Sequence, residues 1–243
     1  MQQSISVQEQ IMNETRQQRR QPRGNGGPQK RRAQQRRRRS NEDNNDDKSW
    51  ADVLLNIVRE PDHPKHRHSI YDMDEQTVII YDKFPKSRRH MLILPRNEEI
   101  DGAHALTKKH LPLLRYMQQR GLWLIQQLTK EVEEEGEGVK LSFKMGYHAV
   151  PTLRQLHLHV LSKDHDAPAM NRVKHWNSFT TDFLVPPEEM IRIVEEEGRF
   201  DPEPYARLKH QLPMKCNECG ETNIPHVSAL REHIQACLCK KYL

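Results

Sequence analysis

The sequence predicts an α+β fold, a mostly antiparallel sheet with one long helix, followed by a small C-terminal zinc finger. Two observations support this prediction. Short strand patterns stand both before and after one long helical pattern, which is typical of a sheet with its helices segregated. All four cysteines, Cys216, Cys219, Cys237 and Cys239, lie close together near the carboxyl end. This clustering favours a metal site in a reducing compartment over disulfides spread along the chain.

Residues 1–48 form the first predicted segment, a disordered basic arm. Residues 1–40 carry eleven Arg and Lys against two Glu, a net charge of +9. Because the whole chain carries +5, the remainder has a net charge of −4. The arm has almost no apolar residues to bury, so we expect it to stay unfolded. Its charge suits nuclear import or non-specific contact with phosphates.

The elements after the arm follow from periodicity and from their start and stop signals. Ser49 is the expected N-cap of a first helix, which begins at Trp50, carries apolar residues at helical spacing and stops at Pro61. The remaining helices are predicted at residues 107–135, 187–197 and 202–210. Strands are predicted at residues 69–72, 77–82, 90–95, 139–147 and 155–162. No apolar run is long enough to cross a membrane.

The predicted elements divide the chain into four parts. The basic arm is followed by a catalytic domain over residues 49–185, a helical connector over 186–212 and a zinc finger over 213–243.

The last predicted strand carries the most informative pattern. Polar and apolar side chains alternate over residues 155–162, which puts Gln155, His157 and His159 on one face. His148 returns toward this face from across a turn that contains Pro151. Such a group supports metal binding, which needs further ligands. It also supports nucleophilic catalysis, in which one neutral imidazole attacks phosphorus while its neighbours donate hydrogen bonds. The strand pattern alone leaves both chemistries open.

The carboxyl-terminal cysteines have the spacing of a zinc finger. Cys216 and Cys219 form a knuckle, His233 follows after thirteen intervening residues, and Cys237 comes after three more. The spacing predicts four zinc ligands of the C2HC type, Cys216, Cys219, His233 and Cys237, with Leu230 in the core of the finger. Cys239 and His226 compete for the place of the fourth ligand; Cys237 is preferred because thiols two residues apart diverge on a helix.

Several segments resemble the histidine-triad (HIT) family of nucleotide hydrolases and transferases. Residues 147–152 and 156–160 are similar to its catalytic segment. Asp82 with residues 85–90 and 92–95 is similar to its nucleoside-binding side. The block 174–179 and the terminal finger narrow the resemblance to the aprataxin branch, which acts on adenylated DNA.

The resemblance implies a DNA-repair hydrolase that removes AMP from 5′-adenylated DNA ends, the products of abortive ligation in single-strand break repair. His157 would be the nucleophile that forms a covalent histidine–AMP intermediate, with His159 and His148 as the other catalytic residues. The implied substrate-binding residues are Asp82, Lys86, Ser87, Arg88, His90, Thr152 and Gln155. The implied cofactor is a structural Zn²⁺ in the finger, and the chemistry needs no metal.

The DNA contacts inferred beside the resemblance come from the first helix, two loops, the block 174–179 and the finger. The candidate DNA-binding residues are Trp50, Arg96, Asn97, Lys163, Asp166, Ala167, Lys174, His175 and Trp176. Trp176 fits a buried core position equally well. The implied partners are nicked or broken 5′-adenylated DNA, with RNA–DNA junctions as a further class of end, and AMP as product. We expect a nuclear location.

One departure from the family pattern keeps alternatives open. The family has histidine at the position of Gln155, and an amide there can donate a hydrogen bond but cannot deliver a proton by titration. We expect this change to disfavour phosphoramidase chemistry more than deadenylation. The alternatives are a small-molecule HIT nucleotide hydrolase, which the finger and the arm argue against, and an inactive zinc-finger adaptor that binds nucleic acid.

The uneven charge generates a prediction. Because the positive charge is concentrated in the arm, deleting residues 1–40 should weaken DNA binding and flatten its dependence on salt, since each lost phosphate contact lowers the slope of log affinity against log salt by about 0.9. The measurement is a salt titration of affinity for a nicked duplex, with and without the arm. An unchanged slope contradicts the prediction.

Overall fold

The structure is a computed structural model that describes residues 50–136, 141–208 and 212–241. The predicted basic arm, the predicted cap Ser49, and parts of the strand predicted at 139–147 and of the helix predicted at 202–210 lie outside these residues. Among the described residues, no helix has the length and apolar character needed to span a membrane.

The strands are β1 (Ile70–Met73), β2 (Thr77–Tyr81), β3 (His90–Pro95), β4 (Phe143–His148), β5 (Leu158–Ser162) and β6 (Leu184–Val185). They form one sheet in the order β1-β2-β3-β5-β4-β6, and all neighbouring strands pair antiparallel. The predicted α+β class with a mostly antiparallel sheet is therefore confirmed. The helices are α3 (Val53–Arg59), α4 (Leu111–Glu134), α5 (Val173–Thr180), α6 (Pro187–Glu197) and α8 (Val227–Lys241).

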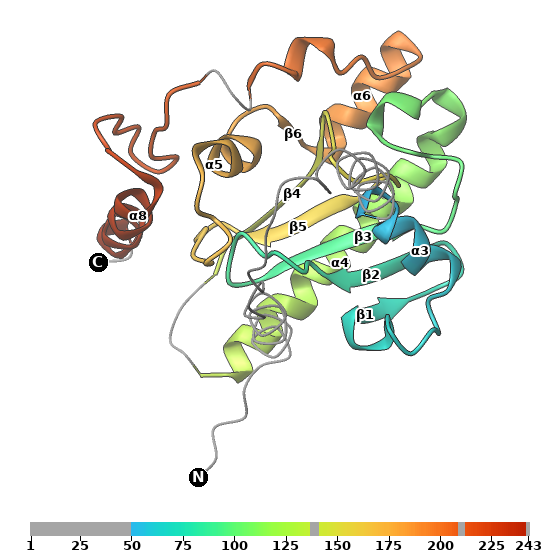
Figure 1. The fold of residues 1–243 in the computed structure, drawn as a ribbon, viewed down its shortest axis with the longest axis horizontal. Helices are drawn as coiled ribbons and strands as arrows, with labels where there is room; N and C mark the ends of the chain where they lie inside the picture. The colour runs from blue at the N-terminus through green and yellow to red at the C-terminus, as the bar shows by residue number, and fades with distance from the viewer. Residues whose placement is uncertain (1–49, 137–140, 209–211, 242–243) are drawn as a thin grey trace, which may run out of the picture.

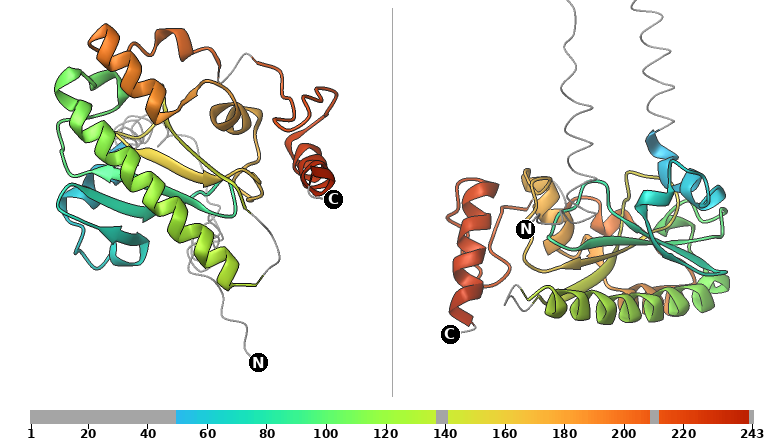
Figure 2. Two further views of the ribbon diagram at one scale, coloured as in Figure 1. Left: turned by 180° about the vertical axis from the view of Figure 1, so that it is seen from behind. Right: turned by 90° about the horizontal axis from the view of Figure 1, so that it is seen from below.

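The two faces of the sheet bury different helices. Figure 2 shows α4 running along one face of the sheet, with α3 and α5 at the other. Alternation along β2 and β3 produces this division, because Ile79 and Ile93 join the core under α4 while Val78 and Leu92 join the core under α3. His90 is two residues from Leu92 on β3 and so lies on the α3 face.

Helix α4 is positioned by its start and by its apolar stripe. A 3₁₀ turn (Lys108–His110) precedes it, and the backbone N–H of Thr107 donates to Nδ1 of His110 (3.1 Å) in a capping box. Leu114, Met117 and Leu124 are buried against the sheet, as their helical spacing predicts.

A third core joins the sheet to the finger. Figure 1 shows α5 between the sheet and α8. In this core the buried side chains of Leu161, Trp176 and Phe179 pack with residues of the finger, among them Leu230 and Ile234. The finger is thus part of the folded body around the sheet.

The packing of helix α6 crosses the domain boundary predicted at residue 185. It lies in the predicted connector, yet it packs on α4 and β4, with Met190 and Val194 in the core under α4. The boundary therefore does not separate two cores.

Other elements differ from the sequence prediction. Strand β5 begins at Leu158, not at Gln155, because Gln155 has a φ of 78° and breaks the extended chain before the strand. Helix α5 and strand β6 were not predicted; both are short and acquire their structure from burial against the sheet and the finger. Within the helix predicted at 202–210, residues Glu203–Tyr205 form a 3₁₀ turn.

Gly146 of β4 generates a stability prediction. A Cβ atom there would lie 2.7 Å from Cγ of Leu184 and 2.9 Å from the backbone oxygen of Val185, so Gly146→Ala must displace β6. We expect a loss of about 1–3 kcal/mol, typical of overpacking. Gly121→Ala is the control, because its Cβ would meet chiefly the flexible Met145 sulfur at 2.6 Å and alanine favours a helix by about 1 kcal/mol.

The measurement is urea unfolding of the zinc-loaded chain. A urea midpoint for Gly146→Ala equal to or above that of Gly121→Ala would contradict the prediction, because it would show that β6 shifts at little cost in stability.

Candidate active site and zinc site

Three imidazoles converge on the α3 and α5 face of the sheet. His159 lies in β5, His148 ends β4, and His157 stands directly before β5. The ring centroids of His148 and His159 are 4.2 Å apart, and those of His157 and His159 are 4.9 Å apart. The antiparallel register pairs Gly146 with His159, which brings the end of β4 beside residue 157. The sequence prediction that these three side chains meet is confirmed by this geometry.

The backbone fixes the tautomer of His157. Its Nδ1 lies 2.9 Å from the carbonyl oxygen of Gln155, which only accepts hydrogen bonds, so Nδ1 carries the proton and Nε2 holds the lone pair. Burial lowers the pKa of the His157 imidazole, opposed by the hydrogen bond to the Gln155 carbonyl and by the charge of Asp82. The ring is therefore neutral at pH 7 and can act as a nucleophile through Nε2.

A second chain of hydrogen bonds orients His159. The backbone N–H of Lys86 donates to Nδ1 of His90 (3.1 Å), so the proton of His90 is on Nε2. This Nε2 lies 2.9 Å from Nδ1 of His159 and 3.6 Å from a carboxylate oxygen of Asp82. Since Nδ1 of His159 accepts, Nε2 of His159 carries its proton. Among the described residues, that buried N–H meets no acceptor, so it can donate to a ligand.

Burial keeps these rings uncharged. It lowers the pKa of His90 to about 4 and the pKa of His159 well below its usual value. His148 and His157 reinforce the shift of His159, because neighbouring positive charges would repel. The site thus combines neutral donors with a neutral nucleophile.

Two aromatic side chains line the histidines and were not among the predicted site residues. The Phe179 ring lies 4.7 Å from the His148 ring, 5.1 Å from the His159 ring and 5.3 Å from the His90 ring, centroid to centroid. Phe183 lies 5.3 Å from His148. These rings supply much of the dry surroundings that lower the histidine pKa values. The i, i+3 spacing of Trp176 and Phe179 is the signal that indicates a buried helix face there.

Lys86 and Asp82 stand at the edge of the histidine cluster. The Lys86 ammonium donates to the carbonyl of Phe84, and burial lowers its pKa while Asp82 opposes the shift. Asp82 accepts from the backbone N–H of Phe84 (2.7 Å) and faces His90. A cation beside neutral donors suits a site that stabilises charge on phosphoryl oxygens.

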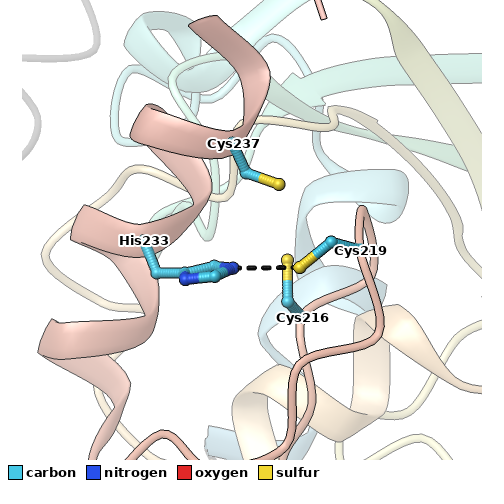
Figure 3. A group of neighbouring side chains, drawn as sticks. All are labelled: Cys216, Cys219, His233 and Cys237. Atoms are coloured by element: carbon cyan, nitrogen blue, oxygen red, sulfur yellow. Dashed lines mark hydrogen bonds between the residues drawn. The ribbon is translucent and has the colours of Figure 1, made fainter. Parts of the chain in front are cut away.

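The four predicted zinc ligands meet in the finger. Figure 3 shows Cys216, Cys219, His233 and Cys237 pointing toward one another, and their donor atoms all lie within 4.8 Å of one another. Sγ of Cys219 is 3.1 Å from Nε2 of His233. Zinc bonds of about 2.0–2.3 Å in a tetrahedron separate donor atoms by about 3.3–3.8 Å, so the group fits Zn²⁺ with small adjustments.

The neighbours of the zinc ligands support the same assignment. Leu230 is fully buried, as predicted. His226 is engaged elsewhere, because its Nδ1 accepts from the backbone N–H of Ala229 (3.1 Å) at the start of α8. The side chain of Cys239 lies outside the described residues.

Comparisons with known proteins identify the family. The family model described as "Scavenger mRNA decapping enzyme C-term binding" matches residues 53–175, and the model described as "C2HE / C2H2 / C2HC zinc-binding finger" matches residues 180–240. The aprataxin-like protein of Schizosaccharomyces pombe is 30% identical over 203 residues, which cover 77% of this chain and 81% of the relative. The chain belongs to the aprataxin family.

Further relatives agree with this assignment. Aprataxins of Danio rerio and Gallus gallus are 38% and 37% identical over 78% and 76% of this chain. The chain spans about half the length of these two relatives, 54% of each. The crystal structure of the aprataxin ortholog Hnt3 from Schizosaccharomyces pombe superposes with a TM-score of 0.61 at 25% identity, covering 79% of this chain and 96% of that one. The fold is therefore the HIT-like aprataxin fold with a C-terminal zinc finger.

In this aprataxin-family chain, Gln155 does not have the predicted role. Its side-chain amide donates to the carbonyls of Pro95 (2.6 Å) and Asn97 (3.0 Å), away from the histidines. The positive φ of Gln155 turns the side chain toward residues 95–97 and its carbonyl toward His157. The residue contributes its backbone oxygen to the site, so the expectation that its amide binds substrate is wrong. Thr152, another predicted substrate-binding residue, is exposed.

Two other predicted substrate residues face the loop after β5. Ser87 is buried, with Oγ 3.3 Å from Nδ1 of His165, and therefore braces the loop. Arg88 lies closer to solvent and pairs with Asp166 at 3.5 Å.

The residues predicted to contact DNA differ in how exposed their side chains are. Trp50 is 44% exposed and lies beside Phe84, with ring centroids 5.6 Å apart. Trp176 is 1% exposed and donates from Nε1 to the carbonyl of Lys215 (2.9 Å), so it is a core residue that anchors the finger. Ala167 is also buried. The expectation that Trp176 and Ala167 contact DNA is wrong, because both residues are almost fully buried.

The remaining predicted DNA contacts are at least partly accessible. Arg96 and Asn97 are exposed after β3, and Lys163, Asp166, Lys174 and His175 are partly exposed around the loop after β5 and on α5. Burial lowers the pKa of His175 to about 4, with Lys86 adding to the shift, so His175 lies near the active site and is neutral.

The ligand assignment generates a prediction about zinc content. Cys237→Ala should lose the bound zinc and with it the finger fold, because three ligands hold the ion far more weakly than four. Cys239→Ala is the matched control and should retain one zinc per chain. Metal analysis after dialysis, with the absorption of a Co²⁺-substituted sample, makes the measurement. Zinc loss from Cys239→Ala, with retention in Cys237→Ala, would show that the fourth ligand is Cys239 and not Cys237.

Proposed function

We propose that this protein is a DNA-repair hydrolase that removes AMP from 5′-adenylated DNA ends through a covalent histidine–AMP intermediate. The observation that carries the proposal is the arrangement of His157, whose Nδ1 is held by the Gln155 carbonyl while Nε2 is left with its lone pair among buried donors.

In the first step Nε2 of His157 attacks the phosphorus of AMP. An N–P bond forms, the bond between that phosphorus and the bridging oxygen breaks, and the DNA leaves with an intact 5′ phosphate. The imidazole gains positive charge as the bond forms, and the hydrogen bond from Nδ1 to the Gln155 carbonyl stabilises that charge. A phosphate leaving group needs little protonation, so the lack of a titrating side chain at Gln155 is tolerated.

Charge that builds on the phosphoryl oxygens meets donors already in place. Nε2–H of His159 is oriented through His90 and is buried, so it reorganises little during the reaction. The Lys86 ammonium adds a nearby positive charge. In the second step water attacks the phosphorus, the N–P bond breaks, and AMP is released as His157 returns to its neutral form.

Three features support DNA as the substrate. The finger packs against the same α5 helix that lines the histidines. Trp50 stands exposed beside Phe84 near the site, where an apolar ring can stack on a terminal base. Hnt3, the aprataxin ortholog with the same fold, was crystallised in complex with DNA. A nuclear location is part of this proposal, and the basic composition of residues 1–40 supports it.

The test is a nicked duplex that carries a labelled 5′-adenylate. Wild-type protein should release AMP and leave 5′-phosphate DNA, whereas His157→Ala should be slower by on the order of 10³-fold or more, because the nucleophile is gone. Labelled AMP bound to the protein should be trapped by an alkaline quench only when His157 is present. His104→Ala is the matched control, since it removes an exposed imidazole that is absent from the cluster.

Each other outcome has a definite reading. Hydrolysis of adenosine phosphoramidate without release from DNA would replace the proposal with a small-molecule hydrolase. Tight DNA binding with no hydrolysis of either substrate would indicate an adaptor. AMP release by His157→Ala at the wild-type rate would exclude His157 as the nucleophile.

A further inference from the structure

The loop after β5 joins the finger to the active site. Three consecutive side chains, Asp164, His165 and Asp166, all reach toward the loop 86–89. Asp164 accepts from the backbone N–H of Arg88 (3.1 Å), Nδ1 of His165 lies 3.3 Å from Oγ of Ser87, and Asp166 pairs with the Arg88 guanidinium at 3.5 Å. We call residues 164–166 the strap.

The conformation of the strap is specific. His165 has a φ of 50°, in the left-handed region that few residues other than glycine adopt, and its ring is buried against Trp176 with centroids 5.1 Å apart. This turn lets the aspartates on both sides of His165 face the same loop, with the backbone N–H of Asp166 donating to Asp164 (2.8 Å). A local conformation of this kind persists only where surrounding contacts hold it.

The finger supplies one of those contacts. Arg231 of α8 donates to Oδ1 of Asp166, while Arg88 faces Oδ2. The Arg231 side chain is 28% exposed and the Asp166 side chain 18% exposed, so the pair is shielded from much of the solvent. The guanidinium of Arg231 thus forms an ion pair with Asp166 of the strap.

From the strap the contacts continue into the histidine cluster. The loop 86–89 contains Lys86, whose backbone N–H fixes the tautomer of His90, and His90 in turn orients His159. The finger helix is therefore connected to Nδ1 of His159 by ion pairs and hydrogen bonds that are joined through the backbone of residues 86–88.

We propose that Arg231 is a positioning residue for deadenylation, which sets the loop 86–89 and with it His90 and His159 through Asp166. This inference rests on the proposed function. It gives the finger two separate roles. The finger contributes to DNA affinity, and through Arg231 it also positions the catalytic groups without changing that affinity.

The first test compares Arg231→Gln with Lys215→Gln. Each removes one positive charge from the finger, but Lys215 has an exposed side chain and no ion pair with the strap. Arg231→Gln should lower kcat on the adenylated nick about tenfold and change KM less than twofold, as for contacts that couple within one network. Lys215→Gln should leave kcat unchanged. Arg231→Lys should recover kcat to within about threefold of wild type.

A double-mutant cycle of Arg231 and Asp166 tests whether the effect of Arg231 passes through Asp166. Asp166→Asn should lower kcat by a similar factor, and the double variant should be no slower than the slower single variant, because both break one connection. Zinc content and thermal unfolding establish that each variant is folded. A rise in KM with unchanged kcat for Arg231→Gln, or additive losses in the double variant, would overturn the proposal.

A spectroscopic readout separates this inference from the proposed function. If wild type fails to release AMP from DNA, the proposed function fails, but the histidine ring nitrogen and carbon signals still report the connection. Arg231→Gln should shift the ring signals of His165 and His90, whereas Lys215→Gln should not. Unchanged ring signals in Arg231→Gln would overturn the positioning role whatever the activity.

Discussion

The hydrogen bond between Nε2 of His90 and Nδ1 of His159 is the interaction on which the rest of the site depends. It joins neighbouring strands β3 and β5, and it assigns the proton of each ring because Lys86 already donates to the other nitrogen of His90. The bond requires neutral rings, and burial under Phe179 provides that condition. The register between β3 and β5 therefore does two things: it pairs the strands, and it orients the His159 ring so that its Nε2–H can donate to a ligand.

Periodicity predicted the parts of the molecule whose structure follows from their own sequence. The β3 and α6 bounds, the apolar side of α4 and the four zinc ligands all came from local spacing. Gln155 could not be predicted in this way, because alternation continues through its position while its backbone leaves the β region. Helix α5 was also missed, since eight residues are too few for a reliable period and its packing partners lie in the finger, far along the chain.

The finger and the sheet share their core through α5. Trp176 and Asn177 bind the carbonyls of Lys215 and Leu212, while Phe179 lines the histidines three residues after Trp176. One buried face of this short helix thus contacts both the finger and the active site. These tertiary contacts explain why Trp176 is buried although it is flanked by polar residues.

The backbone at Gln155 has a consequence for how sequences of this family are compared. The side chain at this position points to the carbonyls of residues 95–97, and only its main-chain oxygen reaches His157. A histidine introduced here on the same backbone would place its ring against residues 95–97 and would add no acid to the reaction centre. In this chain the side chain at the first position of the triad pattern therefore anchors the loop at residues 95–97 and takes no part in the histidine cluster.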